Sequence, residues 1–267
     1  MGLFGPRFMF DEGTTDWIFD TYAWALEHLG TDVFYQFTDL VLPNDRFFPD
    51  KLDETDDVAE RLFTRVRRYA GMEDWPCRLV AQEEDANTRI GPTLLIQGAP
   101  SGPAGTFSVS GGENPTVEIS YNPSQVRRPE ALIATFAHEL AHYLIHSIET
   151  PPPGGDDFEE HATDLVAVFM GFGVFLANSA FSFSQYTDVD SQGWQTFAQG
   201  YLSESQLTYC LAVFLHLKGL DREVVEPYLD NSLHAVLKTA TKEMAHLQDE
   251  VGRLRDITAE KMAQPAL

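Results

Sequence analysis

Basic residues and cysteines are both scarce in this sequence of 267 residues. The chain has 18 lysines and arginines against 41 aspartates and glutamates, which gives a formal net charge of −23 with neutral histidines. Nucleic-acid binding relies on basic surface to displace the counterions of the phosphates, and anionic membranes attract basic segments in the same way. We therefore expect neither nucleic acid nor a membrane as a partner.

The two cysteines, Cys77 and Cys210, are too few for a disulfide framework and do not form a CxxC pair. The first ten residues do not have a charged segment followed by an apolar one, as a secretory signal would. Both observations favour a reducing compartment, because disulfide-rich chains are typical of oxidising ones. We expect a cytoplasmic protein.

One stretch, residues 165–184, has no charged residue and is long enough to span a membrane. Gly171, Gly173 and several asparagines and serines interrupt it, and an acidic cluster at residues 156–164 adjoins its start. A helix that is apolar all round is either a membrane span or a core element. We predict a buried core helix.

Hydrophobic residues make up 43% of the chain and aromatic residues 12%, which is enough for a sizeable core. Apolar periodicity and turn residues predict two helices and then several short strands in the first half. These are helices at residues 14–29 and 54–70, and strands at residues 78–82, 93–97, 106–110 and 116–121. Helices are predicted from there on, at residues 129–148, 158–181, 203–218, 221–237 and 239–257. The pattern predicts an α+β fold, with a lobe of residues 1–150 that contains a small mixed or antiparallel sheet and a mainly helical lobe of residues 151–267.

The sequence His138-Glu139-Leu140-Ala141-His142 is an HExxH motif inside the segment with the clearest helical pattern. Residues four apart lie on one face of a helix, so both imidazoles can reach one small cation while Glu139 lies beside it. His146 continues this face by another four residues. We expect His146 to be a polar residue near the helix C-terminus, where positive charge is favourable, rather than part of the site.

Two acidic residues on the next predicted helix, Glu160 and Asp164, are also four apart. One of them can bind a metal while the other accepts a hydrogen bond from an imidazole and so fixes its tautomer. Glu159 competes with Glu160 as a ligand, and we favour Glu160 because only it has Asp164 four residues further along.

This arrangement resembles the gluzincin branch of zinc metallopeptidases, in which HExxH is followed by ExxxD on a second helix. The resemblance implies that His138, His142 and Glu160 bind one zinc ion per chain. It also implies that Glu139 is the general base and that Asp164 orients a ligand histidine. The fold expected from it is a zincin-like lobe that contains the motif helix, and the expected activity is hydrolysis of peptide bonds in a peptide or protein substrate.

By the same resemblance, Glu139 accepts a proton from a zinc-activated water and passes it to the leaving amine. The resemblance also implies that the strand at residues 116–121 forms the edge of the sheet, where it could pair with an extended peptide. The group that stabilises the oxyanion stays open among His161, Tyr186 and Tyr201.

Two other functions are compatible with the same residues. One is a catalytically inactive binding protein of zincin-like fold, whose acidic helical part mediates protein–protein interaction. The other is a zinc hydrolase that acts on a non-peptide amide. The importance of Glu139 for turnover separates an enzyme from a binding protein.

Overall fold

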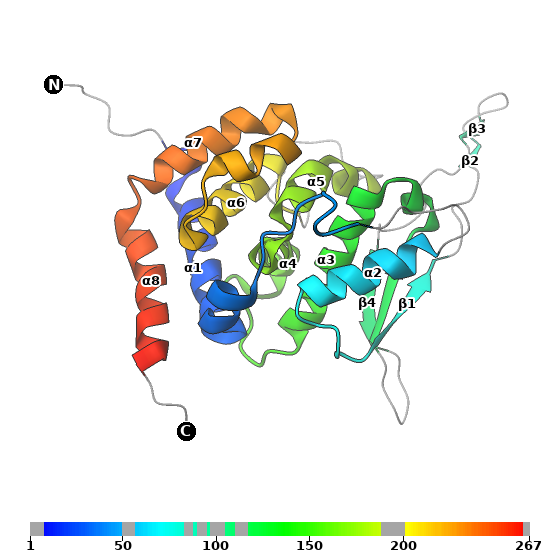
Figure 1. Ribbon diagram of the computed structural model, residues 1–267, viewed down its shortest axis with the longest axis horizontal. Coiled ribbons are helices and arrows are strands. Elements are labelled where there is room, and N and C mark those ends of the chain that lie inside the picture. Colours follow the sequence, from blue (N-terminus) through cyan, green and yellow to red (C-terminus); the bar gives the residue numbers. More distant parts are fainter. Residues whose placement is uncertain are drawn as a thin grey trace.

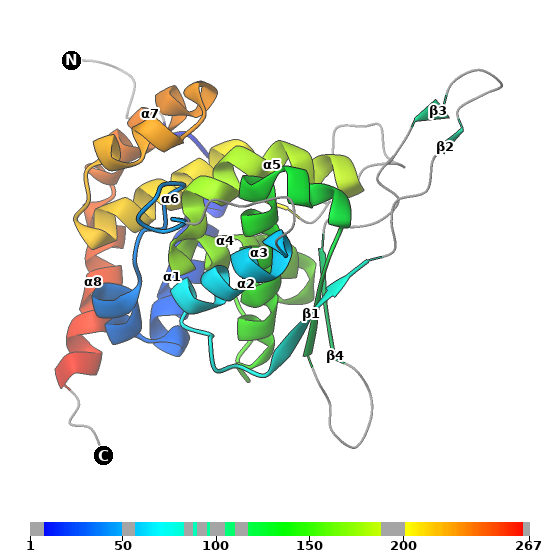
Figure 2. The ribbon, with the colours of Figure 1, turned by 45° about the vertical axis from the view of Figure 1, so that its right-hand side comes forward.

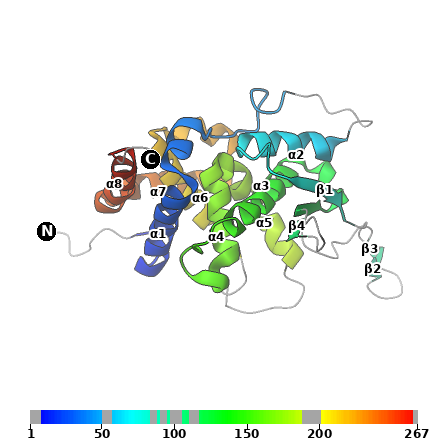
Figure 3. The ribbon, with the colours of Figure 1, turned by 90° about the horizontal axis from the view of Figure 1, so that it is seen from below.

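The computed structural model describes residues 8–49, 57–82, 88–89, 95–96, 105–109, 117–187 and 201–263. The protein has an α+β architecture, as predicted, in which a helical body has a small sheet on one side (Figure 1). The helices are α1 (Glu12–Leu29), α2 (Val58–Tyr69), α3 (Pro129–His146), α4 (Glu159–Ala167), α5 (Gly173–Thr187), α6 (Glu204–Lys218), α7 (His234–Met244) and α8 (Gln248–Ala263). Two π-helical segments, η1 (Val33–Phe37) and η4 (Val168–Phe172), and several 3₁₀ helices lie between them. Helices α1 and α8 lie at the end of the molecule opposite to the sheet (Figure 3).

The central strand of the sheet is β5 (Val117–Tyr121), in the strand order β1-β5-β4. It pairs in parallel with β1 (Cys77–Ala81) and antiparallel with β4 (Gly105–Val109). The prediction that residues 116–121 form the sheet edge is therefore wrong, because strands on both sides use the backbone groups of β5. Alternation of apolar and polar residues indicates that one face of a strand is buried, and this is equally true of central and edge strands. The short strands β2 (Thr88–Arg89) and β3 (Leu95–Ile96) form a separate antiparallel pair.

Helix α3 lies inside the helical body, where it packs against α2, α4, α5 and the strands β4 and β5. Figure 2 shows it between the sheet and the other helices. Every residue from Ala131 to His142 is buried. The HExxH motif is therefore part of the core rather than of an exposed helix face.

One hydrophobic cluster extends through both predicted lobes, from Ile18 on α1 to Leu254 on α8. It includes Leu140 on α3 and Leu165 on α4, on either side of the boundary at residue 150. The division of the chain at this residue stays a prediction.

The described segment Gly155–Ala180, with a mean hydropathy of 1.5 in its most apolar window, is long and apolar enough to cross a membrane. Within the fold, 94% of that window is buried. This burial confirms the prediction of a buried core segment, for the side chains that the structure describes. The segment is not one continuous helix, because α4 passes into the π-helical η4 and then into α5.

Gly171 makes this interruption possible. Its φ of 99° lies in the left-handed region, and its carbonyl oxygen accepts a hydrogen bond of 3.0 Å from the amide of Val41. A Cβ atom at this position would collide with the carbonyl oxygen of Asp39. Only glycine combines this conformation with so close an approach of another backbone segment.

The C-terminal part differs from the prediction of a helix over residues 221–237. Three short 3₁₀ helices occupy most of it, and α7 begins only at His234. Pro227 explains the difference, because proline has no amide hydrogen and disfavours the α conformation of the preceding residue. The helix predicted over residues 239–257 is also divided, between α7 and α8.

Replacing Gly171 with alanine should lower the free energy of unfolding by roughly 2–5 kcal/mol, since a left-handed backbone costs an L-residue about 1–2 kcal/mol and overpacking about 1–3 kcal/mol. The matched control is Gly252→Ala on α8, where an added Cβ has no atom within 4 Å. That control should be neutral or slightly stabilising, because alanine favours helix. Urea unfolding of both variants measures the difference, and equal stabilities would contradict the role of Gly171.

Candidate metal centre

Helices α3 and α4 lie against each other and bring three of the predicted site residues together. Nε2 of His138 is 3.2 Å from Oε2 of Glu160, and Nε2 of His142 is 3.3 Å from the same oxygen. The three ligand atoms all lie within 4.8 Å of one another. His138, His142 and Glu160 can therefore hold a metal ion.

The spacing of these atoms fits tetrahedral coordination. Two ligand atoms at about 2.0–2.1 Å from a tetrahedral zinc ion lie roughly 3.3–3.4 Å apart. The observed separations of 3.2 and 3.3 Å are close to this value. Two imidazoles and one carboxylate are also a ligand set of catalytic zinc sites, which leave one position open. Imidazole accepts copper, iron and nickel as well, so zinc is one of several ions that fit.

The electrostatic surroundings of this group favour a positive charge. Burial alone would lower the pKa of His138, but its hydrogen bonds to Asp164 and Glu160 raise this pKa to about 10. Burial alone would raise the pKa of Glu160, but hydrogen bonds from His138 and His142 lower it well below its usual range. A proton on His138 and a metal ion at its Nε2 thus compete for the same carboxylate-rich site.

The connection between α3 and α4 is fixed by α1. Nε1 of Trp24 donates a hydrogen bond of 3.0 Å to the carbonyl of Thr150, and Nε1 of Trp17 donates one of 2.9 Å to the carbonyl of Pro153. Gly154 follows with a φ of 96°, so the chain reverses direction before α4 begins. These contacts determine where the first turn of α4 presents Glu160 to the two histidines.

Asp164 contacts two groups with its two oxygens. Oδ1 lies 2.9 Å from Nδ1 of His138, and Oδ2 accepts a hydrogen bond of 2.8 Å from the amide of Leu202. A carboxylate that receives the Nδ1 hydrogen leaves the lone pair of Nε2 for a metal and fixes the orientation of the ring. The corresponding neighbours of His142 are Oγ1 of Thr163, 3.3 Å from its Nδ1, and the carboxylate of Glu159.

Glu139 is 5% exposed and lies beside the ligands without being part of the ligand group. Burial raises the pKa of its carboxyl group. The neighbouring His138 and His142 partly offset this increase, and the negative charge of Glu160 adds to it. A carboxylate with a raised pKa is a stronger proton acceptor than one in water.

The three candidates for an oxyanion donor lie in different places. The ring of Tyr201 is 5.4 Å from the ring of His138. Burial and the carboxylates of the site raise the pKa of Tyr201, so its hydroxyl keeps its proton and can donate it in a hydrogen bond. His161 instead packs near the rings of Trp17 and Phe158, at 6.1 and 5.5 Å. The side chain of Tyr186 lies outside the described residues.

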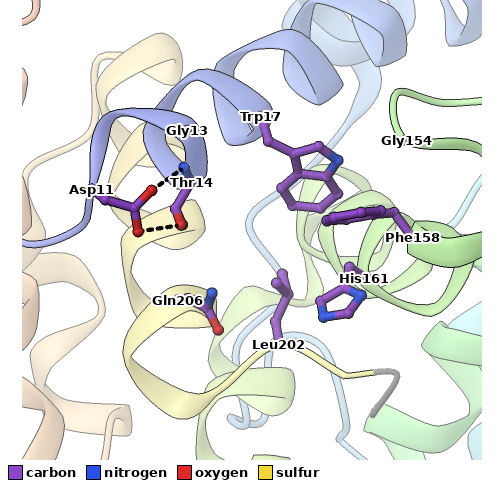
Figure 4. Close-up of a pocket in the computed structure, with 9 residues that line it drawn as sticks. All are labelled: Asp11, Gly13, Thr14, Trp17, Gly154, Phe158, His161, Leu202 and Gln206. Atoms are coloured by element: carbon purple, nitrogen blue, oxygen red, sulfur yellow. Dashed lines mark hydrogen bonds between the residues drawn. The ribbon is translucent and has the colours of Figure 1, made fainter. Parts of the chain in front are cut away.

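A cavity of about 510 Å³ adjoins α4 on the side of His161. Figure 4 shows the rings of Trp17, Phe158 and His161 on one side of it and polar side chains of α1 and α6 across from them. It is lined by Asp11, Gly13, Thr14, Trp17, Gly154, Phe158, His161, Leu202 and Gln206. Leu202 thus lines this cavity with its side chain while its amide holds Asp164. No motif in the sequence indicates the cavity, because its walls come from segments that are far apart in the chain.

Sequence reasoning also missed a contact of His146. This residue ends α3, as expected, but its Nε2 lies 3.0 Å from Oε1 of Glu159. The spacing of His142 and His146 by four residues was the available signal.

Comparisons of the chain with protein-family models, curated proteins and solved structures found no match. The resemblance to gluzincins therefore depends on the motif residues and on the geometry of the group that could hold a metal ion.

Replacing Asp164 with asparagine should weaken metal binding by about 10- to 100-fold, because the partners of ligand histidines typically contribute that much to affinity. The control is Asp157→Asn, which removes the same charge at an exposed position of the 3₁₀ helix η3 (Gly155–Phe158). Competition of Zn²⁺ between the protein and a chelating dye measures both affinities. Equal affinity of the Asp164 variant and the wild type would show that this carboxylate does not orient a ligand.

Proposed function

We propose that this protein is a zinc-dependent metallopeptidase. The observation that carries the proposal is the convergence of His138, His142 and Glu160 on one point beside the buried carboxylate of Glu139. A zinc ion at that point would lower the pKa of a bound water to about 7 and polarise the carbonyl of the scissile bond.

Glu139 would act as the general base. It would take a proton from the attacking water and later give it to the leaving amine, as positioned carboxylates do in general acid–base catalysis. Its burial supports this role, since the raised pKa increases its affinity for the proton. Asp164 would keep the ring of His138 in the orientation that presents Nε2 to the metal.

Tyr201 is the donor that we propose for the oxyanion. Its ring lies next to His138, whereas His161 packs toward the aromatic cavity. Its protonated hydroxyl would donate a hydrogen bond to the oxygen on which negative charge develops.

An extended peptide would bind along β4 rather than along β5. β5 has partners on both sides, whereas β4 is an edge of the three-stranded sheet within the described strands and packs against α3. Peptides that add a strand to a sheet gain affinity from main-chain hydrogen bonds, which carry little sequence preference.

Glu139→Gln should retain about one zinc per chain and lose peptide cleavage by a factor of about 10²–10⁴, the usual contribution of a general base. Cleavage of an unfolded protein substrate, followed together with zinc content by mass spectrometry, measures both properties. His142→Ala is the control that should lose metal and cleavage together.

Wild-type rates in the Glu139 variant would refute the mechanism. Absence of cleavage by either form, with zinc retained, would favour a catalytically inactive binding protein.

Tyr201→Phe should lower kcat by about 10²–10³-fold, the cost of removing one oxyanion donor, and leave KM and zinc content nearly unchanged. The matched control is Tyr143→Phe, since the ring of Tyr143 packs against Trp75 and its hydroxyl bonds to the carbonyl of Pro76, away from the ligands. Steady-state kinetics of the two variants measures the difference. An equal loss of activity in both variants would contradict the role of Tyr201 as the oxyanion donor.

A further inference from the structure

A second group of metal-binding atoms lies one helical turn from the first. Nε2 of His146 is 3.0 Å from Oε1 of Glu159, and Nδ1 of His142 is 3.6 Å from the same oxygen. These three ligand atoms also lie within 4.8 Å of one another. We propose that His142, His146 and Glu159 bind a second divalent transition-metal ion, so that the two sites share the ring of His142.

The two sites have the same construction. His138, His142 and His146 follow one another at intervals of four along α3, and α4 presents two consecutive glutamates to them. Each glutamate places one oxygen between two of the histidines. At the second site the two separations, 3.0 and 3.6 Å, lie on either side of the roughly 3.3–3.4 Å expected between ligands of a tetrahedral ion.

His142 offers a different nitrogen to each site. Its Nε2 faces Glu160, whereas its Nδ1 lies 3.6 Å from Oε1 of Glu159 and 3.3 Å from Oγ1 of Thr163. Coordination of Nδ1 would require the ring to release its remaining proton to solvent and to give up its contact with Thr163. The second ion should consequently bind more weakly than the first.

The surroundings of the second site suit a cation that exchanges with solvent. The side chains of His146 and Glu159 are 47% and 35% exposed. Both residues line a cavity of about 150 Å³, and Glu149 and Asp156 are among its other lining residues. Since a water molecule occupies about 30 Å³, this space accommodates the waters that would complete the coordination. The imidazole ligands favour transition metals over Mg²⁺ or Ca²⁺.

Titration of the chelator-treated full-length protein with Zn²⁺ alone tests the inference, with calorimetry for the binding steps and native mass spectrometry for the stoichiometry. The wild type should bind two ions in two steps. His146→Ala should lose the weaker step and keep the tighter one. The side chain of His146 is partly exposed, so this variant should fold. His246→Ala, at an exposed position after α7, is the control that should bind two ions.

His138→Ala separates the two sites, because it removes a ligand of the first site only and should keep one weaker ion. A wild type that binds one ion, unchanged by His146→Ala, would overturn the second site and leave the first intact. Two ions in both the wild type and His146→Ala would place the second ion elsewhere and would equally overturn the inference. A protein that binds no ion would refute the second site together with the proposed zinc enzyme.

Discussion

The contact between α3 and α4 is the interaction on which the rest of the structure depends. α3 lies within the core, so the two imidazoles and the carboxylate of its motif are removed from water. Buried polar and charged groups are costly unless they have partners. α4 supplies partners for the two imidazoles through Glu160, Asp164 and Thr163. The residues that satisfy these buried imidazoles include the group that could hold a metal ion, so a bound ion would stabilise the fold.

The position of α4 is in turn determined by distant parts of the chain. The indoles of α1 hold the connection between α3 and α4, and the close approach of residues 39–41 to Gly171 fixes the point where the helical segment bends. In the first of these contacts indole N–H groups donate to backbone carbonyls, and in the second a backbone amide does, so no charged surface group is involved. The candidate metal centre therefore has rigid elements on each side, as precise ligand geometry requires.

Local sequence spacing predicts well which residues come together at the candidate metal centre, but it predicts the order of the sheet poorly. The position of His138, His142, Glu160 and Asp164 follows from the helical period, since residues four apart share a face. The central place of β5 depends instead on its pairing with β1, forty residues earlier, and no local pattern encodes that contact. The contact of Tyr201 with the ring of His138 and the contact between His146 and Glu159 are likewise tertiary. The break at Pro227 was readable from the sequence, but apolar periodicity favoured a continuous helix there.

The carboxylate of Asp164 connects two different parts of the structure. One of its oxygens faces the imidazole of His138, and the other receives the amide of Leu202, at the start of the chain that leads into α6. A rigid carboxylate with both oxygens engaged cannot move toward one partner without leaving the other. The wall of the aromatic cavity at Leu202 and the ring of His138 are therefore linked through the carboxylate of Asp164, although Leu202 and His138 lie more than sixty residues apart in the chain.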